Sequence, residues 1–320
     1  MLGGTIGGDD DLQFHDVAMT HEPTLLIVNP IAGRGRGRRG AAALAAALQS
    51  LGIPFVEAAT THRGHARELA AAARGTVVAI GGDGTVHEVV DGLPIREGRL
   101  GPLAVLPCGS GDDWAKSVRL SRNPLAVAAA IAHRTTREID IGEATFTGPD
   151  GTQRRRFANA AGLGLDAEVA AEAAKPHRLR GRLLYFFATL RVLGRLRSFR
   201  ATIQCDAHPP RTADLTFLST CNGQFFGGGL HLVPDGRCDD GLLDAVQLAA
   251  VPRRTILWLF AKLALGRHRG DPRVRLDRVT RIRIDTDRPV PSSLDGEVLP
   301  TPVSSVVYSV LPERLSLIAP

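Results

Sequence analysis

The sequence lacks the features that mark membrane-spanning or exported proteins. Its two most apolar windows, residues 183–193 and 255–265, are interrupted by Arg191 and Lys262. Both fall well short of the about 18 apolar residues that a bilayer-crossing helix needs. Residues 1–22 are rich in Gly and Asp and lack the basic start and apolar stretch of a signal peptide, so we expect a disordered tail there.

Cysteine and histidine are too sparse and scattered to predict a zinc site or a disulfide framework. The four cysteines form no C-x-x-C pair; they are Cys108, Cys205, Cys221 and Cys238. Such spacing favours reduced thiols, and the histidines show no metal-ligand spacing. We therefore expect a cytoplasmic protein without a transmembrane segment, able to associate peripherally with a membrane.

The composition is that of a globular protein with two domains. The chain has 320 residues, of which 44% are apolar and 22% charged. The net charge is +6, and arginines are grouped at residues 34–39, 154–156 and 178–200. Such patches suit phosphates, anionic lipids or nucleic acid, but arginine is abundant throughout and these groups also fit a general compositional habit.

Residues 23–136 alternate between strand and helix patterns. Strands are expected at residues 24–28, 54–60, 76–80 and 103–106, and helices at 41–51, 64–74 and 86–93. Repeated βαβ units predict a doubly wound, Rossmann-like α/β domain whose ligands lie beyond the carboxyl ends of the strands.

Residues 137–300 change to short β-branched or alternating runs, which predict a β-sandwich. Strands are expected at 137–141, 156–160, 201–205, 214–221, 243–248 and 281–285, with helical insertions at 180–197 and 252–266. One face of the first insertion is apolar, formed by Leu183, Phe186, Phe187, Leu190 and Leu193. Such a stripe most often packs into a core, although its basic flank also suits a membrane surface or an acyl chain. Residues 301–320 are expected to pack back on the first domain.

A glycine-rich motif, residues 81–85 (GGDGT), follows the expected strand at 76–80. Glycine lets the backbone approach a phosphate, and the next helix presents free N–H groups to anions. Asp83 would repel phosphates unless a divalent cation intervenes, so it is best explained by Mg²⁺. The alternative is an ordinary turn in which Asp83 caps the helix.

Two further glycine-rich loops, residues 29–37 and 106–114, follow neighbouring strands and would complete a phosphate cradle. The first loop also fits a dinucleotide fingerprint, Gly35-x-Gly37-x-x-Gly40 with Glu57, which keeps an NAD-binding oxidoreductase as an alternative. That fingerprint needs its acidic residue at a strand end, whereas Glu57 is expected inside a strand.

Acidic residues cluster twice in the second half. Asp295-Gly296-Glu297 is either a plain hairpin turn or a pair of carboxylates that orient and deprotonate an attacking hydroxyl. Residues 239–244 (DDGLLD) are either a solvated turn or a site for a hard cation.

Taken in order, these motifs resemble the diacylglycerol kinase catalytic family, which includes bacterial lipid kinases and sphingosine kinases. The resemblance spans residues 24 to about 312. Its elements are Asn29-Pro30, Thr60, residues 81–85 with Glu88, residues 107–113, the segment 159–167 (NAAGLGLDA), the glycines 227–229, Pro234, residues 240–243 and residues 295–297.

The resemblance implies ATP and Mg²⁺ as cofactors and catalysis between an ATP-binding domain and a lipid-binding domain. The residues that would bind ATP are Asn29, Pro30, Gly33, Thr60, Gly81, Gly82, Asp83, Gly84, Thr85, Gly109, Ser110 and Asp112. Asp295 and Glu297 would activate the hydroxyl together with Asp83, and Asp166 would bind the lipid head. Asp240 and the carbonyls of Arg237 and Leu242 would hold a structural Mg²⁺.

The resemblance also implies a lipid acceptor at a membrane surface, such as diacylglycerol or a sphingoid base, and no nucleic-acid partner; a homodimer is compatible with it. A kinase of a soluble acceptor such as NAD, and a member that binds lipid or nucleotide without catalysis, are the alternatives. Residues 109–113 (GSGDD) depart from the family's G-T-x-N-D, because Asp112 replaces an amide and adds negative charge near the phosphates.

Overall fold

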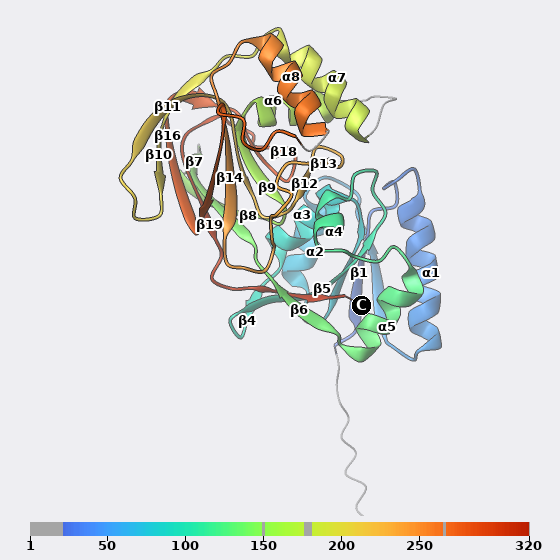
Figure 1. Ribbon diagram of the computed structural model, residues 1–320. Coiled ribbons are helices and arrows are strands. Elements are labelled where there is room, and N and C mark those ends of the chain that lie inside the picture. Colours follow the sequence, from blue (N-terminus) through green and yellow to red (C-terminus); the bar gives the residue numbers. More distant parts are fainter. Residues whose placement is uncertain (1–21, 149–150, 176–180, 265–266, 320) are drawn as a thin grey trace, which may run out of the picture.

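The computed structural model describes residues 22–148, 151–175, 181–264 and 267–319 (Figure 1). Apart from Glu22, the tail expected at residues 1–22 lies outside the described residues. No helix in the described part is long and apolar enough to cross a bilayer.

The first domain is built on a mainly parallel sheet with the strand order β2-β1-β3-β5-β20-β6. Its strands are β1 (Thr24–Val28), β2 (Phe55–Ala59), β3 (Val77–Gly81), β4 (Ile95–Arg96), β5 (Arg99–Pro107), β6 (Thr136–Ile139) and β20 (Leu315–Ile318). Strand β20 pairs parallel with β5 and antiparallel with β6, so a segment from the end of the chain lies inside this sheet.

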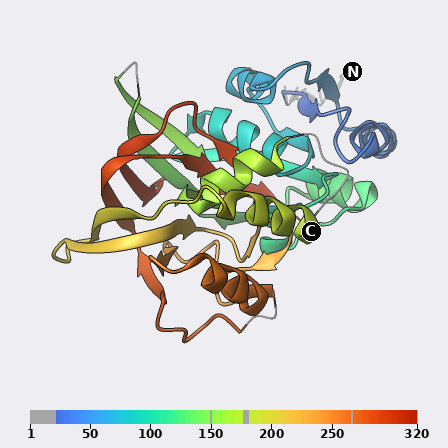
Figure 2. The same ribbon diagram turned by 90° about the horizontal axis from the view of Figure 1, so that it is seen from above.

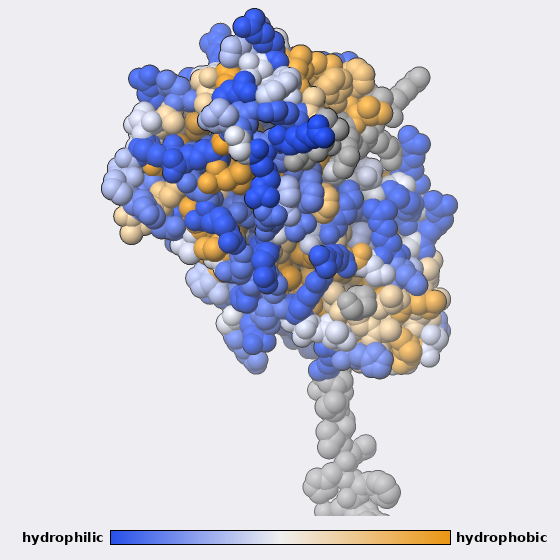
Figure 3. All heavy atoms as spheres, in the orientation of Figure 1, coloured by the Kyte–Doolittle hydropathy of each residue, from blue (hydrophilic) through white to orange (hydrophobic). Residues whose placement is uncertain are grey.

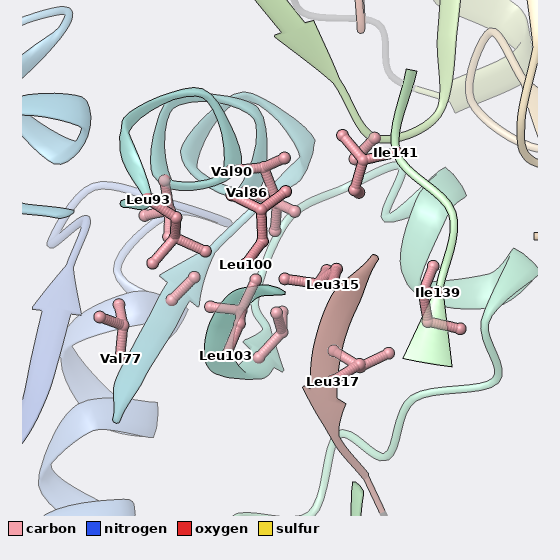
Figure 4. Close-up of a cluster of buried hydrophobic side chains, with 14 of the residues drawn as sticks. Val77, Val86, Val90, Leu93, Leu100, Leu103, Ile139, Ile141, Leu315 and Leu317 are labelled. Carbon is pink, nitrogen blue, oxygen red and sulfur yellow. The ribbon is translucent and has the colours of Figure 1, made fainter. Parts of the chain in front are cut away.

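Helices cover both faces of this sheet. They are α1 (Arg36–Ser50), α2 (His65–Ala72), α3 (Asp83–Gly92), α4 (Asp113–Ser117) and α5 (Pro124–His133). Alternate strand residues face opposite sides: Val77 packs in the cluster of α2 and α3 that Figure 4 shows, whereas Val78 packs with α1 and α5. Because both faces are buried, the strands are nearly all apolar, and the expected doubly wound domain is confirmed.

The second domain is built on one antiparallel sheet of eleven strands that curls on itself (Figure 1). Its strands are β7 (Gly142–Gly148), β8 (Gly151–Phe157), β9 (Ala160–Gly164), β10 (Phe199–Cys205), β11 (Arg211–Cys221), β14 (Leu243–Ala249), β15 (Val274–Val279), β16 (Arg281–Val290), β17 (Ser292–Leu294), β18 (Glu297–Val298) and β19 (Val303–Val310). The inner side is filled by buried residues such as Phe157, Phe199 and Tyr308. The expected β-sandwich with helical insertions is confirmed as a β-rich domain, in which a single sheet curls around the core.

The insertions are α6 (Leu165–Ala173), α7 (Gly181–Leu193), a small hairpin of β12 (Phe225–Phe226) and β13 (Leu230–His231), and α8 (Arg253–Ala264). Figure 2, which looks down on this end of the molecule, shows α7 and α8 lying over the sheet on the viewer's side. A ring contact of 5.6 Å between Phe186 and Phe260 joins the two helices.

One expected strand is wrong, and the apolar stripe of the first helical insertion is only partly buried. A strand was expected at 156–160, but the chain bends at residues 158–159 between β8 and β9, because backbone N–H groups there donate to the Asp295 side chain instead of to a strand. In α7, Leu183, Phe187 and Leu190 are exposed, and the buried side chains are Ala188, Thr189, Val192 and Leu193. Ala188, Val192 and Leu193 pack in one cluster with residues of α6, so Leu183, Phe187 and Leu190 face outward.

The chain crosses between the two sheets twice. It leaves the first sheet after β6, which includes residues 136–139, and returns between β19 and β20. Strand β19 belongs to the second sheet, so β20 is the part of the expected C-terminal segment that lies in the first sheet. At the crossing, the buried Asp140 binds Arg314, with a distance of 3.0 Å between Oδ1 and Nε, and accepts the Gly241 N–H at 2.7 Å.

Candidate active site

The glycine-rich loops meet at the carboxyl ends of β1, β3 and β5, as parallel strands require. Asn29 Nδ2 donates to Thr85 Oγ1 at 3.2 Å, which joins the loop after β1 to the first turn of α3. A Cβ on Gly82 would lie 3.0 Å from the Cα of Gly109, so the loops after β3 and β5 touch through their backbones. The three loops therefore line one end of the sheet.

The motif at residues 81–85 is half strand and half helix. Gly81 ends β3, Gly82 precedes the helix, and α3 begins at Asp83 rather than at Val86 as expected. An acidic residue in the first turn is favourable because the helix N-terminus is positive. Asp83, Gly84 and Thr85 thus form the first turn of α3, with unpaired N–H groups facing the cradle.

The other residues expected to contact ATP come from the same edge of the sheet. Thr60 follows β2 and donates its N–H to Val28 O at 2.8 Å. Gly33, in the loop with Pro30, has a φ of 55°, and a Cβ there would lie 2.1 Å from Cys108 O. Any side chain at Gly33 would therefore push the first loop away from the third. Ser110 lines an open pocket together with Asp83, Asp113 and Tyr185.

Asp83 carries the most perturbed charge of this cradle. Its pKa is raised to about 7, chiefly by burial and also by the nearby charges of Asp113 and Asp112, while backbone N–H groups lower it. Trp114 N donates to Asp83 Oδ1 at 3.3 Å, and no cationic side chain among the described residues forms an ion pair with Asp83. The cradle thus holds negative charge that the described residues do not neutralise.

Asp112, the departure from the family pattern, points into its own loop. It accepts the Gly109 N–H at 2.9 Å and pairs with Arg122 at 2.8 Å. Burial raises the pKa of Asp112, while Arg122 and the Gly109 N–H lower it. The added charge therefore supports the shape of the loop, and Arg122 offsets it.

Two carboxylates flank Gly111 and fit a magnesium ion bound with nucleotide phosphates. A Cβ on Gly111 would lie 2.9 Å from Asp83 Oδ2 and 3.8 Å from Asp113 Oδ1. No group of three or more His, Cys, Asp or Glu side chains suited to a metal occurs in the described ranges. Kinase sites hold Mg²⁺ through one or two carboxylates and the substrate phosphates, so Asp113 alone would be enough to hold the ion and Asp83 need not bind it.

Asp295 and Gly296 form the two-residue turn between β17 and β18. Their φ angles of 49° and 84° are both left-handed, and Leu294 pairs with Glu297 across the turn. This is the geometry of an Asp-Gly hairpin, so the hairpin interpretation of this motif holds. The turn also projects Asp295 into the space between the two sheets.

Both oxygens of Asp295 are fully engaged. Oδ1 accepts the N–H groups of Asn159 and Ala160 at 2.7 and 2.9 Å, and Oδ2 accepts the Ala158 N–H at 2.7 Å. The fourth partner is His87, whose Nδ1 lies 3.0 Å from Oδ2. Asp295 could take a proton from a substrate only if one of these bonds broke, which favours a positioning role.

His87 is a residue of the site that the sequence did not identify. It is buried on α3, one turn after Asp83, and its bond to Asp295 joins the first domain to the second. Burial alone would lower the pKa of His87, but the bond and charge of Asp295 and the charges of Glu297 and Asp91 raise it. Only its spacing of four residues from Asp83, one helical turn, could have indicated this position.

Glu297 lies beside the first turn of α3. Its Oε2 pairs with Arg63 at 3.2 Å, and a Cβ on Gly84 would lie 3.8 Å from its Oε1. Glu297 lines one pocket with Arg63, Arg67 and His87, whereas Asp295 and Asp166 line a different pocket. The structure thus places Asp295 and Glu297 on the same turn but gives them different surroundings.

Asp166 lies where an apolar cavity opens toward the cradle. It lines both this cavity and the pocket that contains Asp83 and Asp295. Burial raises the pKa of Asp166 to about 7, and its hydrogen-bond partner is Ser293 Oγ at 3.4 Å. Tyr185 of α7, also missed by the sequence reasoning, lines the same two spaces.

The cavity itself occupies about 790 Å³, including its open mouth, between the sheet, α6, α7 and α8. Apart from Asp166, its polar lining residues are Tyr185, Thr189 and His268. Branched and aromatic side chains form the rest. This lining suits a ligand whose body is apolar.

The acidic segment at residues 239–244 has a cationic partner of its own. Asp240 Oδ2 binds Arg278 of β15, and Arg278 Nε lies 3.6 Å from Asp244 Oδ1. Asp240 Oδ1 accepts the Leu242 N–H at 3.1 Å. Arg278 thus offsets the charge of Asp240, and the structural Mg²⁺ expected at Asp240 and the carbonyls of Arg237 and Leu242 stays a prediction.

Comparison with known proteins agrees with this geometry. Residues 23–144 match the diacylglycerol kinase catalytic domain, and residues 159–319 match the YegS C-terminal NAD kinase beta sandwich-like domain. A putative diacylglycerol kinase from Bacillus anthracis has a similar solved structure, with a TM-score of 0.73 at 23% identity, covering 93% of this chain and 98% of that one.

Two curated relatives match most of the chain. A diacylglycerol kinase of Mycobacterium tuberculosis is 32% identical over 265 residues, which is 81% of this chain and 82% of the relative. A probable lipid kinase, YegS-like, of Pseudomonas aeruginosa is 29% identical over 307 residues, 94% and 96% of the two chains. These matches replace the oxidoreductase alternative, and the chain belongs to the diacylglycerol kinase family.

Proposed function

We propose that this kinase transfers the γ-phosphate of ATP to the hydroxyl of a lipid. The observation that carries the proposal is the apolar cavity that shares Asp166 and Tyr185 with the pocket containing Asp83 at the glycine-rich loops. A soluble acceptor such as NAD would leave this cavity unused. A hydrocarbon chain in the cavity would instead place a polar head at Asp166, beside Asp83.

The nucleotide is proposed to lie on the loops after β1, β2, β3 and β5. Backbone N–H groups of the glycine loops and the first turn of α3 would bind its phosphates, as helix N-termini do in other phosphate sites. The Asp113 carboxylate and phosphate oxygens of the nucleotide would together hold Mg²⁺. The ion would neutralise negative charge on the transferred phosphoryl group. Asn29 and Thr85 already hold two loops together and would orient the nucleotide.

We assign acceptance of the hydroxyl proton to Asp83. It lines the pocket that contains Asp166, it lacks an ion-pair partner among the described residues, and its pKa of about 7 suits a base at neutral pH. Asp295 would have a positioning role, because its four hydrogen bonds hold the bend at residues 158–160 against α3. Glu297 would hold the opposite side of the same turn.

The test is phosphate transfer from labelled ATP, with Mg²⁺, to a lipid panel that includes diacylglycerols and sphingoid bases, with NAD as the soluble acceptor. We expect a lipid product and a loss in kcat of about 100-fold or more for Asp83→Asn. Asp239→Asn, an exposed carboxylate of the second domain, is the matched control and should keep the parent rate. Phosphorylation of NAD alone, or equal rates for both variants, would overturn the proposal.

A further inference from the structure

We infer that the outer face of α7 and α8 docks on an anionic lipid bilayer. This docking face consists of Leu183, Phe187 and Leu190 on α7 and Trp258 on α8, whose exposed fractions are 61%, 45%, 37% and 47%. The inference rests on the proposed lipid acceptor but concerns a different surface from the active site.

Three side chains of the docking face form one stripe on α7, and Trp258 adds an exposed ring on the neighbouring helix α8. Leu183, Phe187 and Leu190 are spaced by four and three residues, so they lie along one side of the helix. Figure 3 shows hydrophobic residues gathered at the top of the molecule, where Figure 1 places α7 and α8. A large exposed apolar patch on a soluble protein marks an interaction site.

The positive charge on α7 and α8 favours an anionic partner. Neither α7 nor α8 contains Asp or Glu. Arg253 and Arg254 begin α8, are exposed, and have no carboxylate partner among the described residues. Apolar residues beside unpaired arginines are the combination that binds the headgroup region of an anionic membrane.

Trp258 has the surroundings of an interfacial tryptophan. Lys262 Nζ lies 3.8 Å from its ring centroid, and the Arg273 guanidinium lies 4.8 Å from it. Tryptophan with cations on its face is enriched where an apolar phase meets a polar one. Because Lys262 and Arg273 both pair with Asp271, the unneutralised charge beside this ring is that of Arg253 and Arg254. A two-fold contact with a second copy of this chain would bring those arginines against one another, which disfavours that occupant.

The opposite faces of the two helices line the apolar cavity. Tyr185 and Thr189 of α7 and Ile256 and Phe260 of α8 face inward, whereas the docking face points outward. A bilayer against the docking face would therefore lie directly beside the proposed acceptor cavity. The lipid could move between bilayer and cavity without exposing its hydrocarbon chain to water.

The experiment measures binding of the full chain to phosphatidylcholine vesicles with and without phosphatidylglycerol, which needs no catalysis. We expect binding that requires the anionic lipid and that falls about tenfold or more in a Leu183→Ser/Phe187→Ser variant. Leu125→Ser is the matched control, because Leu125 is an exposed leucine on α5 of the first domain and should leave binding unchanged. Arg253→Gln/Arg254→Gln should remove the preference for phosphatidylglycerol.

Tryptophan fluorescence supplies a second readout. The chain has two tryptophans, and Trp114 is buried in the first domain. Brominated lipids should quench Trp258, and Trp258→Phe should abolish the quenching. Equal binding of the serine variant and its parent, or no quenching, would overturn the inference, as would a self-associating parent that the serine substitutions make monomeric. If the protein binds the vesicles but phosphorylates no lipid, the proposed function is wrong and the inference about the docking face still holds.

Discussion

Asp83 and Asp166 are two carboxyl groups whose ionisation depends on burial, and both face the same pocket. Each has a pKa near 7, so at neutral pH each exchanges a proton readily. A cationic side chain pairs with neither in the described part of the chain. The ionisation of both carboxyl groups therefore depends on which ligand enters the pocket, as is expected of groups that contact a substrate.

The pH dependence of the rate should report Asp83. Because its pKa is raised to about 7, the carboxyl is protonated below that pH and cannot accept the hydroxyl proton. We expect kcat/KM for ATP to rise as pH increases from 6 to 8, with an apparent pKa about 7 in the free enzyme. A profile that stays flat over this range would exclude Asp83 as the base.

Replacing Asp166 by Asn should stabilise the protein while impairing lipid use. The folded-state pKa of Asp166, about 7, is above its ordinary value of 3.8, so ionised Asp166 destabilises the fold and this cost grows as pH rises through that interval. Above pH 7 the cost is on the order of 4 kcal/mol. Thermal unfolding should show a higher Tm for Asp166→Asn at pH 8 and a much smaller difference at pH 5. Equal differences at both values would contradict the assignment.

At the scale of elements, the turn between β17 and β18 connects the two domains through α3. Asp295 binds the bend between β8 and β9 from one side and His87 from the other. A second link lies nearby, where Asp91 of α3 accepts from Arg155 Nε at 2.6 Å and from the Arg156 N–H at 2.8 Å. Helix α3 thus carries both Asp83 and the contacts that hold the second domain against it.

The His87–Asp295 bond should make stability depend on pH. The folded-state pKa of His87 is raised above 6.5, so its contribution is fully present below pH 6.5 and is lost as pH rises through the folded value. His87→Asn should therefore lower the free energy of unfolding by about 1–3 kcal/mol at pH 6, and by less at pH 9. Denaturant unfolding at both pH values measures this. His133→Asn, an exposed histidine that ends α5, is the control and should show neither effect.

Arg278 of β15 and a structural metal ion would compete for Asp240. With the guanidinium bound to Asp240 and near Asp244, we expect EDTA to leave the Tm of the protein unchanged. Arg278→Gln should leave Asp240 and Asp244 without this cation, lowering the Tm and making it respond to added Mg²⁺. A Tm of the parent protein that falls with EDTA would instead support the metal ion predicted at Asp240.

At the scale of the whole molecule, the order of strands and helices and the glycine loops were predictable because they depend on local patterns. Buried parallel strands such as β3 are continuous apolar runs, and glycines mark the loops that follow them. The strand expected at 156–160 failed for the opposite reason. Its backbone donors bind Asp295, a residue more than a hundred positions away, and no local pattern records that contact.

The sequence predicted which loops form the site, but it did not predict the hydrogen bonds that connect the site residues to one another. The loops that carry Asn29, Asp83 and Gly109 meet because parallel strands end at the same edge. The partners of Asp295 and the position of Tyr185 depend on how the second sheet is placed against the first. The direction of the apolar residues on α7 depended on which side chains fitted against α6, since large apolar residues occur around most of that helix.

Strand β20 lies between β5 and β6, and its Leu315 and Leu317 are completely buried in the core of the first domain. During synthesis, a ribosome makes the glycine loops and the rest of that sheet long before it makes this strand. Until residues 315–318 leave the exit tunnel, β5 has an open edge and part of the core is exposed to water. The first domain of a nascent chain therefore cannot finish folding before the whole second domain has been translated.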